Sequence, residues 1–311
     1  MIVKTRFNLA RVFWNIRYEA LSSVGVAALC QILYRLQVVD LALPWSISAI
    51  LGSALAIFIA FRNQSSYGRW WEARTVWGQI VNTSRISARQ LLANTRGAVA
   101  AGQAREDEAS AFAAEMIRRH IAFAHALRLH VRRQESWEEL RHLLPESEFA
   151  ELLQRPNKPN HLLLTLGLRV REGIGKQWLG GFDNISMEPN LSSLNNAQGA
   201  CERIKNTPLP MNYQYFTRLF LYVFIFVLPF GMVGDLTRLQ LDWMLVPASF
   251  LVSFVFAVMN RVGEINENPF ENAMQDVPMT ALCNTIERDL LDMMNEKNLP
   301  EKTQAVDGYL Y

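Results

Sequence analysis

The sequence contains little of what builds disulfide frameworks, zinc sites or catalytic centres. Cysteine occurs three times in 311 residues, at Cys30, Cys201 and Cys283, and never in a CxxC spacing. This excludes a disulfide framework and a zinc site, and we expect the three side chains to pack as thiols. HExxH, GxSxG and a matched pair of carboxylates are also lacking. We therefore predict no enzymatic activity, no cofactor and no metal site.

An excess of charge of one sign is missing as well. Lys and Arg number 31 against 29 Asp and Glu, a net charge of +2 that gives no reason to expect nucleic acid as a partner. Half of the residues are hydrophobic, and the mean hydropathy is +0.04. These averages conceal a strong segregation of apolar runs from charged stretches. No cleavable signal peptide is expected, because the first apolar run follows Arg17 and Glu19 without a small-residue cleavage site.

Long apolar runs are what the sequence does have. The run Leu41–Phe61 carries no charged residue and, at ~1.5 Å per helical residue, spans ~30 Å, the thickness of a hydrocarbon core. Two further runs, Leu219–Gly234 and Trp243–Asn260, are joined by a short polar turn, which is typical of a transmembrane hairpin. We predict a membrane protein from these three runs.

A fourth run, Ala20–Val39, is interrupted by Gln31 and Arg35. We predict that it also spans the membrane, because Arg35 lies near one end and can extend its charge to the interface. Four spans place both termini on one side. The positive charges on that side are Lys4, Arg6, Arg11, Arg17, Arg62, Arg69, Arg74, Arg203, Lys205, Arg218 and Arg261, against only Arg35 and Arg238 in the opposite loops. This bias predicts cytoplasmic termini, in a bacterial inner membrane.

The remaining sequence is polar and has helical periodicity with no β-rich segment. Breaks are predicted at Pro145, 155–160, 173–175 and 180–181, and a terminal amphipathic helix carries Leu282, Ile286, Leu290 and Met293. The stretch Arg118–Arg133, with five arginines and no acid, is interpreted as a solvated face, or as a surface that concentrates anions.

The predicted fold is an all-α membrane protein whose segments are 1–19 (cytoplasmic), 20–62 (first hairpin, including a pore-lining helix), 63–217 (cytoplasmic helices), 218–261 (second hairpin) and 262–311 (cytoplasmic loop and helix).

The second predicted span has two stripes that repeat every four residues. One stripe, Gly52, Ala56 and Ala60, is small enough to let helices approach closely. The other, Ser53, Ile57 and Phe61, can line a narrow apolar passage of the kind that gates by dewetting, or simply pack between helices. We expect the helix to continue into RNQSSYGRWWEAR, which places an interfacial motif of Arg69, Trp70, Trp71 and Glu72 at the cytoplasmic boundary.

Several of these segments, in this order, resemble the bestrophin family over nearly the whole chain. The segments are FRNQSSYGRWWEAR after the second span, ACERIKNTPLP before the third, and INENPF after the fourth. The resemblance implies a homopentamer around one central pore. It also implies a neck at Ser53, Ile57 and Phe61 and a cytosolic aperture at Ile185.

Two positions depart from the family pattern. The first neck position is usually apolar, and Ser53 there is expected to widen or wet the outer neck. The animal members carry a calcium clasp on an acidic run after NPF, of which this chain keeps only Asn268 and Asp276. Because Ca²⁺ needs several oxygen ligands, we expect weak or no calcium dependence.

The function implied by the resemblance is a pentameric ion channel for small monovalent ions. Animal bestrophins conduct anions, whereas the bacterial branch includes cation conductors. Chloride is favoured here because arginines outnumber acids around the predicted cytoplasmic mouth. A sodium channel of the same fold and a non-conducting membrane scaffold are the alternatives. A coupled transporter is disfavoured, because no repeated halves and no charged groups at mid-membrane are visible.

Overall fold

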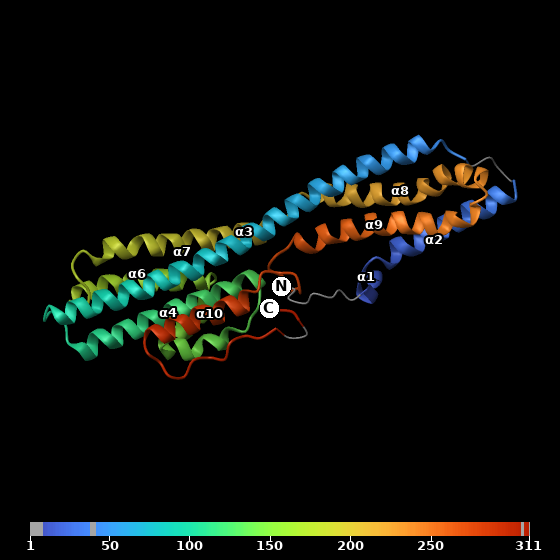
Figure 1. The fold of residues 1–311 in the computed structure, drawn as a ribbon. Helices are drawn as coiled ribbons and strands as arrows, with labels where there is room; N and C mark the ends of the chain where they lie inside the picture. The colour runs from blue at the N-terminus through green and yellow to red at the C-terminus, as the bar shows by residue number, and fades with distance from the viewer. Residues whose placement is uncertain (1–8, 38–41, 306–307, 311) are drawn as a thin grey trace. The chain divides into compact units, whose positions relative to one another are not determined.

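The computed structural model describes residues 9–37, 42–305 and 308–310. Within those ranges the chain forms α-helices and two short 3-10 helices and no β-strand, which confirms the predicted all-α class. The chain divides into two compact units (Figure 1). Of the described residues, the apolar unit contains those from 9 to 70 together with Pro208–Asn268, and the polar unit contains Trp71–Thr207 and those from 269 to 310.

The apolar unit is a helical bundle held by large aliphatic and aromatic side chains. Its elements are α1 (Leu9–Asn15), α2 (Arg17–Arg35), the first part of α3 (Trp45–Ala100), α8 (Met211–Arg238), η2 (Asp242–Met244) and α9 (Leu245–Asn266). Helix α2 packs against α8 and α9, and α8 packs against α9. Leu55 and Ile59 of α3 enter one core with Leu221, Ile225 and Leu228 of α8. This part of α3 is therefore fixed by the second hairpin.

The predicted apolar runs correspond to helices whose ends are set by local chemistry. Helix α3 begins at Trp45, directly after Pro44, whose fixed φ suits a helix start. The helix continues past Phe61 and through Gly68, so the predicted continuation into RNQSSYGRWWEAR is confirmed, and it extends to Ala100. Helix α8 continues through Pro229. Leu41, Val39, Lys4 and Arg6 lie outside the described residues.

Among the described residues, three helices are long and apolar enough to cross a membrane, namely Trp45–Ala100, Met211–Arg238 and the segment Asp242–Asn266. Helix α2 is not among them, because Gln31 and Arg35 lower its hydropathy. Gln31 donates to the carbonyl of Asp242 at 2.9 Å, and Arg35, with 61% of its side chain exposed, pairs with the Asp242 carboxylate. The membrane crossing of α2 therefore remains a prediction.

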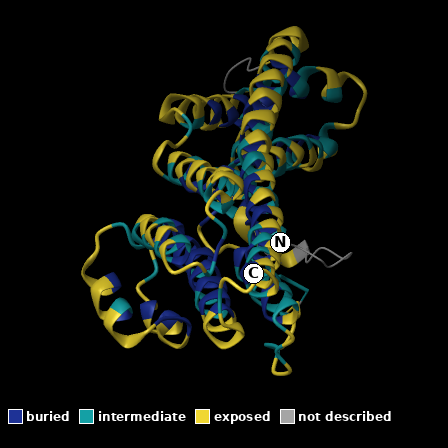
Figure 2. Cartoon of the chain, turned by 90° about the vertical axis from the view of Figure 1, so that its left-hand side faces the viewer, coloured by how far each residue is buried: buried dark blue, intermediate teal, exposed yellow. Residues whose placement is uncertain are grey.

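Exposed residues occur along much of the chain (Figure 2). In the apolar unit they include many large apolar ones. Ile50 is 68% exposed on α3, Phe226 is 57% exposed on α8 and Leu251 is 62% exposed on α9. Exposed apolar surface on this scale is unfavourable in water and marks contact with lipid or with other protein chains. The pattern agrees with the predicted membrane location of these helices.

The polar unit surrounds a central helix, α4 (Glu106–Arg132), which contacts the other helices of this unit and is buried along most of its length. The surrounding elements are the part of α3 from Trp71, η1 (Trp137–Leu143), α5 (Glu146–Gln154), α6 (Lys158–Gly175), α7 (Asp183–Asn206) and α10 (Met279–Met293). Three predicted breaks are confirmed, because α5 follows Pro145, the side chain of Asn157 caps α6, and residues 180–181 precede α7. The predicted break at 173–175 is wrong, because these residues form the last turn of α6. The predicted terminal amphipathic helix is α10, which buries Cys283, Ile286 and Leu290.

The interpretation of Arg118–Arg133 as a solvated face is wrong for three of its five arginines. Arg119, Arg128 and Arg132 are 4%, 7% and 9% exposed. Arg119 pairs with Glu148 at 2.6 Å, Arg128 pairs with Glu139 at 2.5 Å, and Arg132 donates to Thr280 at 2.7 Å. The acids that pair with these arginines lie outside the stretch, at Glu115 before it and at Glu139 and Glu148 after it, so the stretch looks more basic in the sequence than it is in the fold.

The prediction for the cysteines is confirmed. Cys30, Cys201 and Cys283 are all buried and free. The thiol of Cys283 donates to the carbonyl of Ala124 at 3.3 Å, and burial raises its pKa to about 12. Burial also raises the pKa of Cys201. Both thiols of the polar unit are thus held in the unreactive, protonated form at neutral pH.

Candidate functional site

The neck stripe, Ser53, Ile57 and Phe61, lies on the outer surface of α3. Ile57 is 57% exposed and Phe61 is 68% exposed, whereas Leu55 and Ile59, on the other side of the helix, are almost fully buried. Ser53 is exposed, and its hydroxyl donates to the carbonyl of Ala49 at 2.8 Å, so its polar group is satisfied within the helix. The three side chains therefore share one face that no other helix of the apolar unit covers.

The small stripe contacts the second hairpin at one end. A Cβ added at Gly52 would lie 3.0 Å from the ring of Phe224 on α8, so glycine permits this close approach. Ala60, two turns further along, is exposed. The side chains that pack α3 into the bundle are Leu55 and Ile59, and the small stripe is adjacent to that packed face.

A hollow beside the neck stripe was not predicted from the sequence. It has a volume of about 580 Å³ and is bounded by the second half of the neck stripe and by the segment that leads into α8. Its lining residues are Ile57, Phe58, Phe61, Arg62, Ser65, Leu209, Pro210 and Tyr213. The sequence gives no signal for this hollow. Leu209 and Pro210 lie about 150 residues from Phe61 and show no periodicity of their own.

A buried group of charged and polar side chains lies directly after the neck. We call it the Arg62 cluster and define it as Arg62 of α3 with Asn260, Glu264 and Glu267 from α9 and its C-cap. Arg62 is 3% exposed; it donates to Asn260 Oδ1 at 2.8 Å and to Glu267 Oε2 at 3.2 Å, and its guanidinium lies 3.8 Å from Glu264. Such a buried cation is tolerated only because acceptors surround it.

Two more arginines neutralise the outer side of this cluster. Arg218 of α8 reaches Glu264 at 2.9 Å, and Arg261 reaches the same carboxylate at 2.6 Å. Their side chains are 51% and 42% exposed, so these pairs are partly solvated. Glu264 therefore joins α8 and α9, and Glu267 is the carboxylate nearest to Arg62.

The division of the chain into two units falls within the predicted interfacial motif, between Trp70 and Trp71. In the apolar unit, Arg69 donates to the backbone carbonyl of Glu267 at 2.9 Å, and Trp70 stacks on Tyr67 with ring centroids 6.2 Å apart. In the polar unit, Glu72 pairs with Arg203, and Trp71 is 56% exposed. The predicted placement of this motif at a membrane boundary stays a prediction.

Ile185, the predicted aperture residue, lies in the first turn of α7 and is 66% exposed. The turn before it is fixed by Asp183, whose carboxylate accepts the backbone N–H of Gly180 at 2.7 Å. Phe182, three residues before Ile185, is 83% exposed. This end of the helix therefore presents apolar side chains outward from a well-fixed turn, and α7 belongs to the polar unit.

Comparisons with known proteins agree over most of the chain. The family model described as "Bacterial/Fungal Bestrophin protein" matches residues 5–292. The voltage-dependent anion channel-forming protein YneE of Escherichia coli (strain K12) is 33% identical over 97% of both chains. A crystal structure of a bacterial bestrophin homolog from Klebsiella pneumoniae superposes with a TM-score of 0.80 at 31% identity, over 91% of this chain and 100% of that chain.

The chain belongs to the bestrophin family. A further relative, the voltage-dependent anion channel-forming protein RSc3414 of Ralstonia nicotianae, is 32% identical over 83% of this chain and 79% of the relative. The apolar helices and this membership make the chain an integral membrane protein. The resemblance seen in the sequence is thereby confirmed.

The two predicted clasp positions, Asn268 and Asp276, have different environments. Asn268 is exposed, whereas Asp276 is 2% exposed and accepts the backbone N–H of Ala273 at 3.0 Å. Burial raises the pKa of Asp276, which makes its charged form less favourable. Among the described residues no group of three His, Cys, Asp or Glu side chains is arranged to hold a metal ion. Weak or absent calcium dependence remains a prediction.

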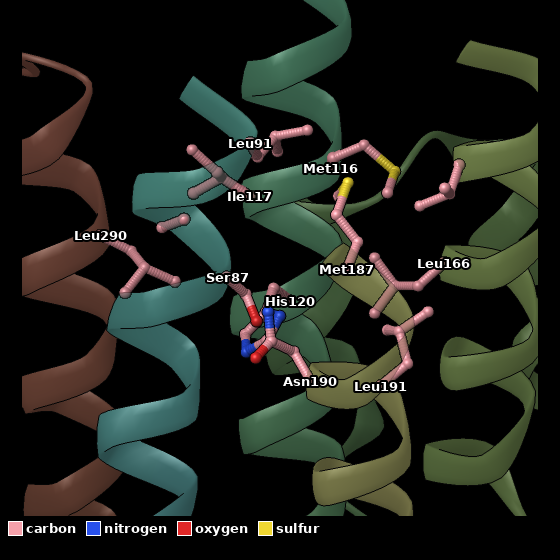
Figure 3. Close-up of a pocket in the computed structure, with 12 residues that line it drawn as sticks. Ser87, Leu91, Met116, Ile117, His120, Leu166, Met187, Asn190, Leu191 and Leu290 are labelled. Atoms are coloured by element: carbon pink, nitrogen blue, oxygen red, sulfur yellow. The ribbon is translucent and has the colours of Figure 1, made fainter. Parts of the chain in front are cut away.

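The polar unit of this bestrophin also contains a small internal cavity beside His120 (Figure 3). The cavity has a volume of about 30 Å³, and the side chains of Ser87, His120 and Asn190 gather on one side of it, with Leu91, Met116 and Met187 around the rest. That volume suits about one water molecule, so it is not a ligand site. Ser84 donates to the carbonyl of Ile80 at 2.7 Å, so its oxygen accepts from His120 Nε2 at 3.0 Å.

Proposed function

We propose that this bestrophin is a homopentameric channel that passes small monovalent anions, chloride in particular, through one central pore. The observation that carries the proposal is the neck stripe, an exposed apolar face on a helix that is otherwise packed into the bundle. Five copies of that face around an axis would form a narrow apolar passage, which opposes ion entry by the cost of dehydration. Bestrophin membership points to a channel rather than an enzyme.

The anion preference has support from the relatives. Both YneE and RSc3414 carry the name voltage-dependent anion channel-forming protein, and they are similar to this chain over most of its length. The arginine excess gives less support than the sequence suggested, because Arg119, Arg128 and Arg132 are buried with partners. The alternative is a sodium-conducting channel of the same fold. The neck carries no charge, so it suits a cation as well as an anion.

The proposed membrane arrangement has four spans, α2, the first part of α3, α8 and α9, with both termini and the polar unit in the bacterial cytoplasm. It is supported by the positive charges that flank the predicted spans on the terminus side. In this arrangement Ser53, Ile57 and Phe61 form the neck, and Ile185 forms the aperture on the cytosolic side. Arg69, Trp70, Trp71 and Glu72 lie at the cytoplasmic boundary.

The deciding experiment is the reversal potential of the purified protein in planar bilayers with asymmetric NaCl. A shift towards the chloride equilibrium potential is expected, and a shift towards the sodium potential would replace the anion channel with the cation alternative. Native mass spectrometry of the same preparation is expected to give a pentamer. Absence of current from a verified pentamer would favour the non-conducting scaffold.

A further inference from the structure

We propose that Arg62 is a positioning residue of the neck: its buried contacts with Glu267 and Asn260 hold α3 at the rotation that turns Ile57 and Phe61 outward. This inference rests on the proposed channel function, because it names the residue that orients the neck of that channel. Arg62 itself does not touch the passage, because its side chain is 3% exposed and directed into the bundle against α9.

The partners of Arg62 share one face of α9. Asn260, Glu264 and Glu267 are spaced by four and three residues, so their side chains follow one stripe of the helix. Arg62 donates separate N–H groups to Asn260 at 2.8 Å and to Glu267 at 3.2 Å. A planar guanidinium with two acceptors in fixed directions restrains orientation as well as distance.

Two neighbouring contacts restrain α3 on the same side. Asn63 donates to the carbonyl of Met259 at 2.9 Å, and Arg69 donates to the carbonyl of Glu267 at 2.9 Å. Arg62 and Arg69 are seven residues apart, close to two full turns, so they extend from the same side of α3. The backbones also approach closely here, because a Cβ added at Gly263 would collide with Asn63.

Helix geometry then fixes where the neck residues point. Successive residues are about 100° apart around a helix, so Phe61 lies about 100°, Ile57 about 140° and Ser53 about 180° from Arg62. A contact that holds Arg62 against α9 therefore turns the whole neck stripe away from α9. The exposures of Ile57 (57%) and Phe61 (68%) agree with that geometry.

The free energy needed to separate Arg62 from its buried partners makes these contacts an effective restraint on the rotation of α3. Rotation of α3 would leave a guanidinium and a carboxylate buried without partners, and breaking a buried pair by losing one partner costs several kcal/mol. The outer arginines cannot replace it, because Arg218 and Arg261 both bond Glu264, and neither lies on α3. Arg62 thus pairs the neck helix with the side-chain carboxylate of Glu267, whereas Arg69 bonds only the backbone carbonyl of that residue.

The test measures which face of α3 is open to water in conducting channels. The substitution Ile57→Cys is introduced with or without Arg62→Met, and the rate at which a charged, membrane-impermeant methanethiosulfonate alters the current is recorded. Ala56→Cys, about 100° away from Ile57, is the matched position. The native cysteines form a suitable background, because all three are buried.

With Arg62 in place, we expect rapid modification at position 57 and slow modification at position 56. Arg62→Met should lower the rate at position 57 by on the order of tenfold and raise it at position 56, since the loss of a buried partner is worth more than the 1.4 kcal/mol that a tenfold change represents. Arg62→Lys, which keeps the charge but loses the two fixed donor directions, should change the pattern less than Arg62→Met does. Arg218→Met, which removes a partly solvated cation from Glu264, should retain the original pattern.

The outcomes separate the two proposals. If Ile57→Cys is not modified in the presence of Arg62, the neck assignment itself fails. If it is modified equally fast with Arg62→Met, the neck stands and the positioning role is overturned; a role in stability alone would lower the yield of pentamer without changing the pattern. Should Arg62→Met give no pentamer, Glu267→Gln provides the same comparison with a smaller expected shift.

Discussion

Phe61 and Arg62 are neighbours in the chain and have opposite environments: 68% of Phe61 is exposed, whereas only 3% of Arg62 is. The helix turns by about 100° between them, which is enough to move a side chain from the open face of α3 to the face that packs on α9. The end of the neck stripe and the start of the Arg62 cluster therefore meet at one peptide bond. Changes to the two sides should have different effects on the channel.

Ile57→Ala and Phe61→Ala are each expected to raise single-channel conductance. Truncation removes apolar volume from the proposed constriction, which lowers the barrier to wetting. Leu251→Ala is the control, because it truncates an apolar side chain that is 62% exposed on α9 and not part of the neck stripe. Bilayer recordings that gave unchanged conductance for both neck variants would contradict the assignment.

Ile185→Ala is expected to change ion selectivity or rectification while the pentamer remains intact. The side chain is 66% exposed at the start of α7, so its truncation should cost little stability. Leu168→Ala, which truncates a side chain that is 61% exposed on α6, should leave the current–voltage relation unaltered. The measurement is the reversal potential and rectification ratio in asymmetric salt, and wild-type values for Ile185→Ala would remove the aperture from this position.

Acid should destabilise the polar unit through His120. Burial lowers the pKa of His120 to about 4, whereas an unfolded histidine titrates near ~6.5. Between those values the unfolded state binds more protons, so the free energy of unfolding falls as the pH falls from ~6.5 towards 4, by about 3 kcal/mol in all. Thermal unfolding of the detergent-solubilised protein across this range measures the effect.

The matched variant for this measurement is His120→Gln. Glutamine can still donate to Ser84 and does not titrate, so its unfolding temperature should depend less on pH over the same interval. The difference between the two slopes, rather than either slope alone, isolates His120 from the other titrating groups. Parallel slopes would show that the imidazole is not responsible.

Gly173→Ala is expected to destabilise the polar unit by ~1–3 kcal/mol, the usual cost of overpacking. A Cβ at this position would lie 2.7 Å from the ring of Phe112, which is itself 2% exposed and unable to withdraw easily. Gly167→Ala on the same helix α6 meets only Leu191, at 4.0 Å, and should be neutral or slightly stabilising. A denaturation series that ranked the two variants in the opposite order would show that Phe112 can move aside.

The sequence predicted the helices well because each has a local signal. The absence of charge between Leu41 and Phe61, the uninterrupted pattern that follows and the spacing of Ile286 and Leu290 depend only on residues within a few turns. Hydropathy and periodicity report such short-range order directly. The end of α3 at Ala100 could not be placed, because the helix continues through Gly78 and Gly97 and no proline marks its end.

The Arg62 cluster was beyond the reach of such signals. In the sequence Arg62, Arg218 and Arg261 are counted as positive charges that flank the spans, and nothing nearby indicates that Arg62 is buried. Its partners Asn260 and Glu267 lie about 200 residues further along the chain. Ion pairs of this separation leave no periodic trace, so the sequence predicts a side of the membrane for these charges and does not indicate which of them are paired.

The two units are interleaved along the chain, and this has a consequence for biosynthesis. Leu55 and Ile59 pack against Leu221 and Ile225, which the ribosome reaches after completing most of the polar unit. At ~5–20 residues per second, the first hairpin must wait roughly 10–30 s for those partners. The polar unit waits in turn for α10, the last helix. Nascent chains that stop before α8 would therefore lack packing partners in the cores of both units. We expect membrane quality-control proteases to degrade them.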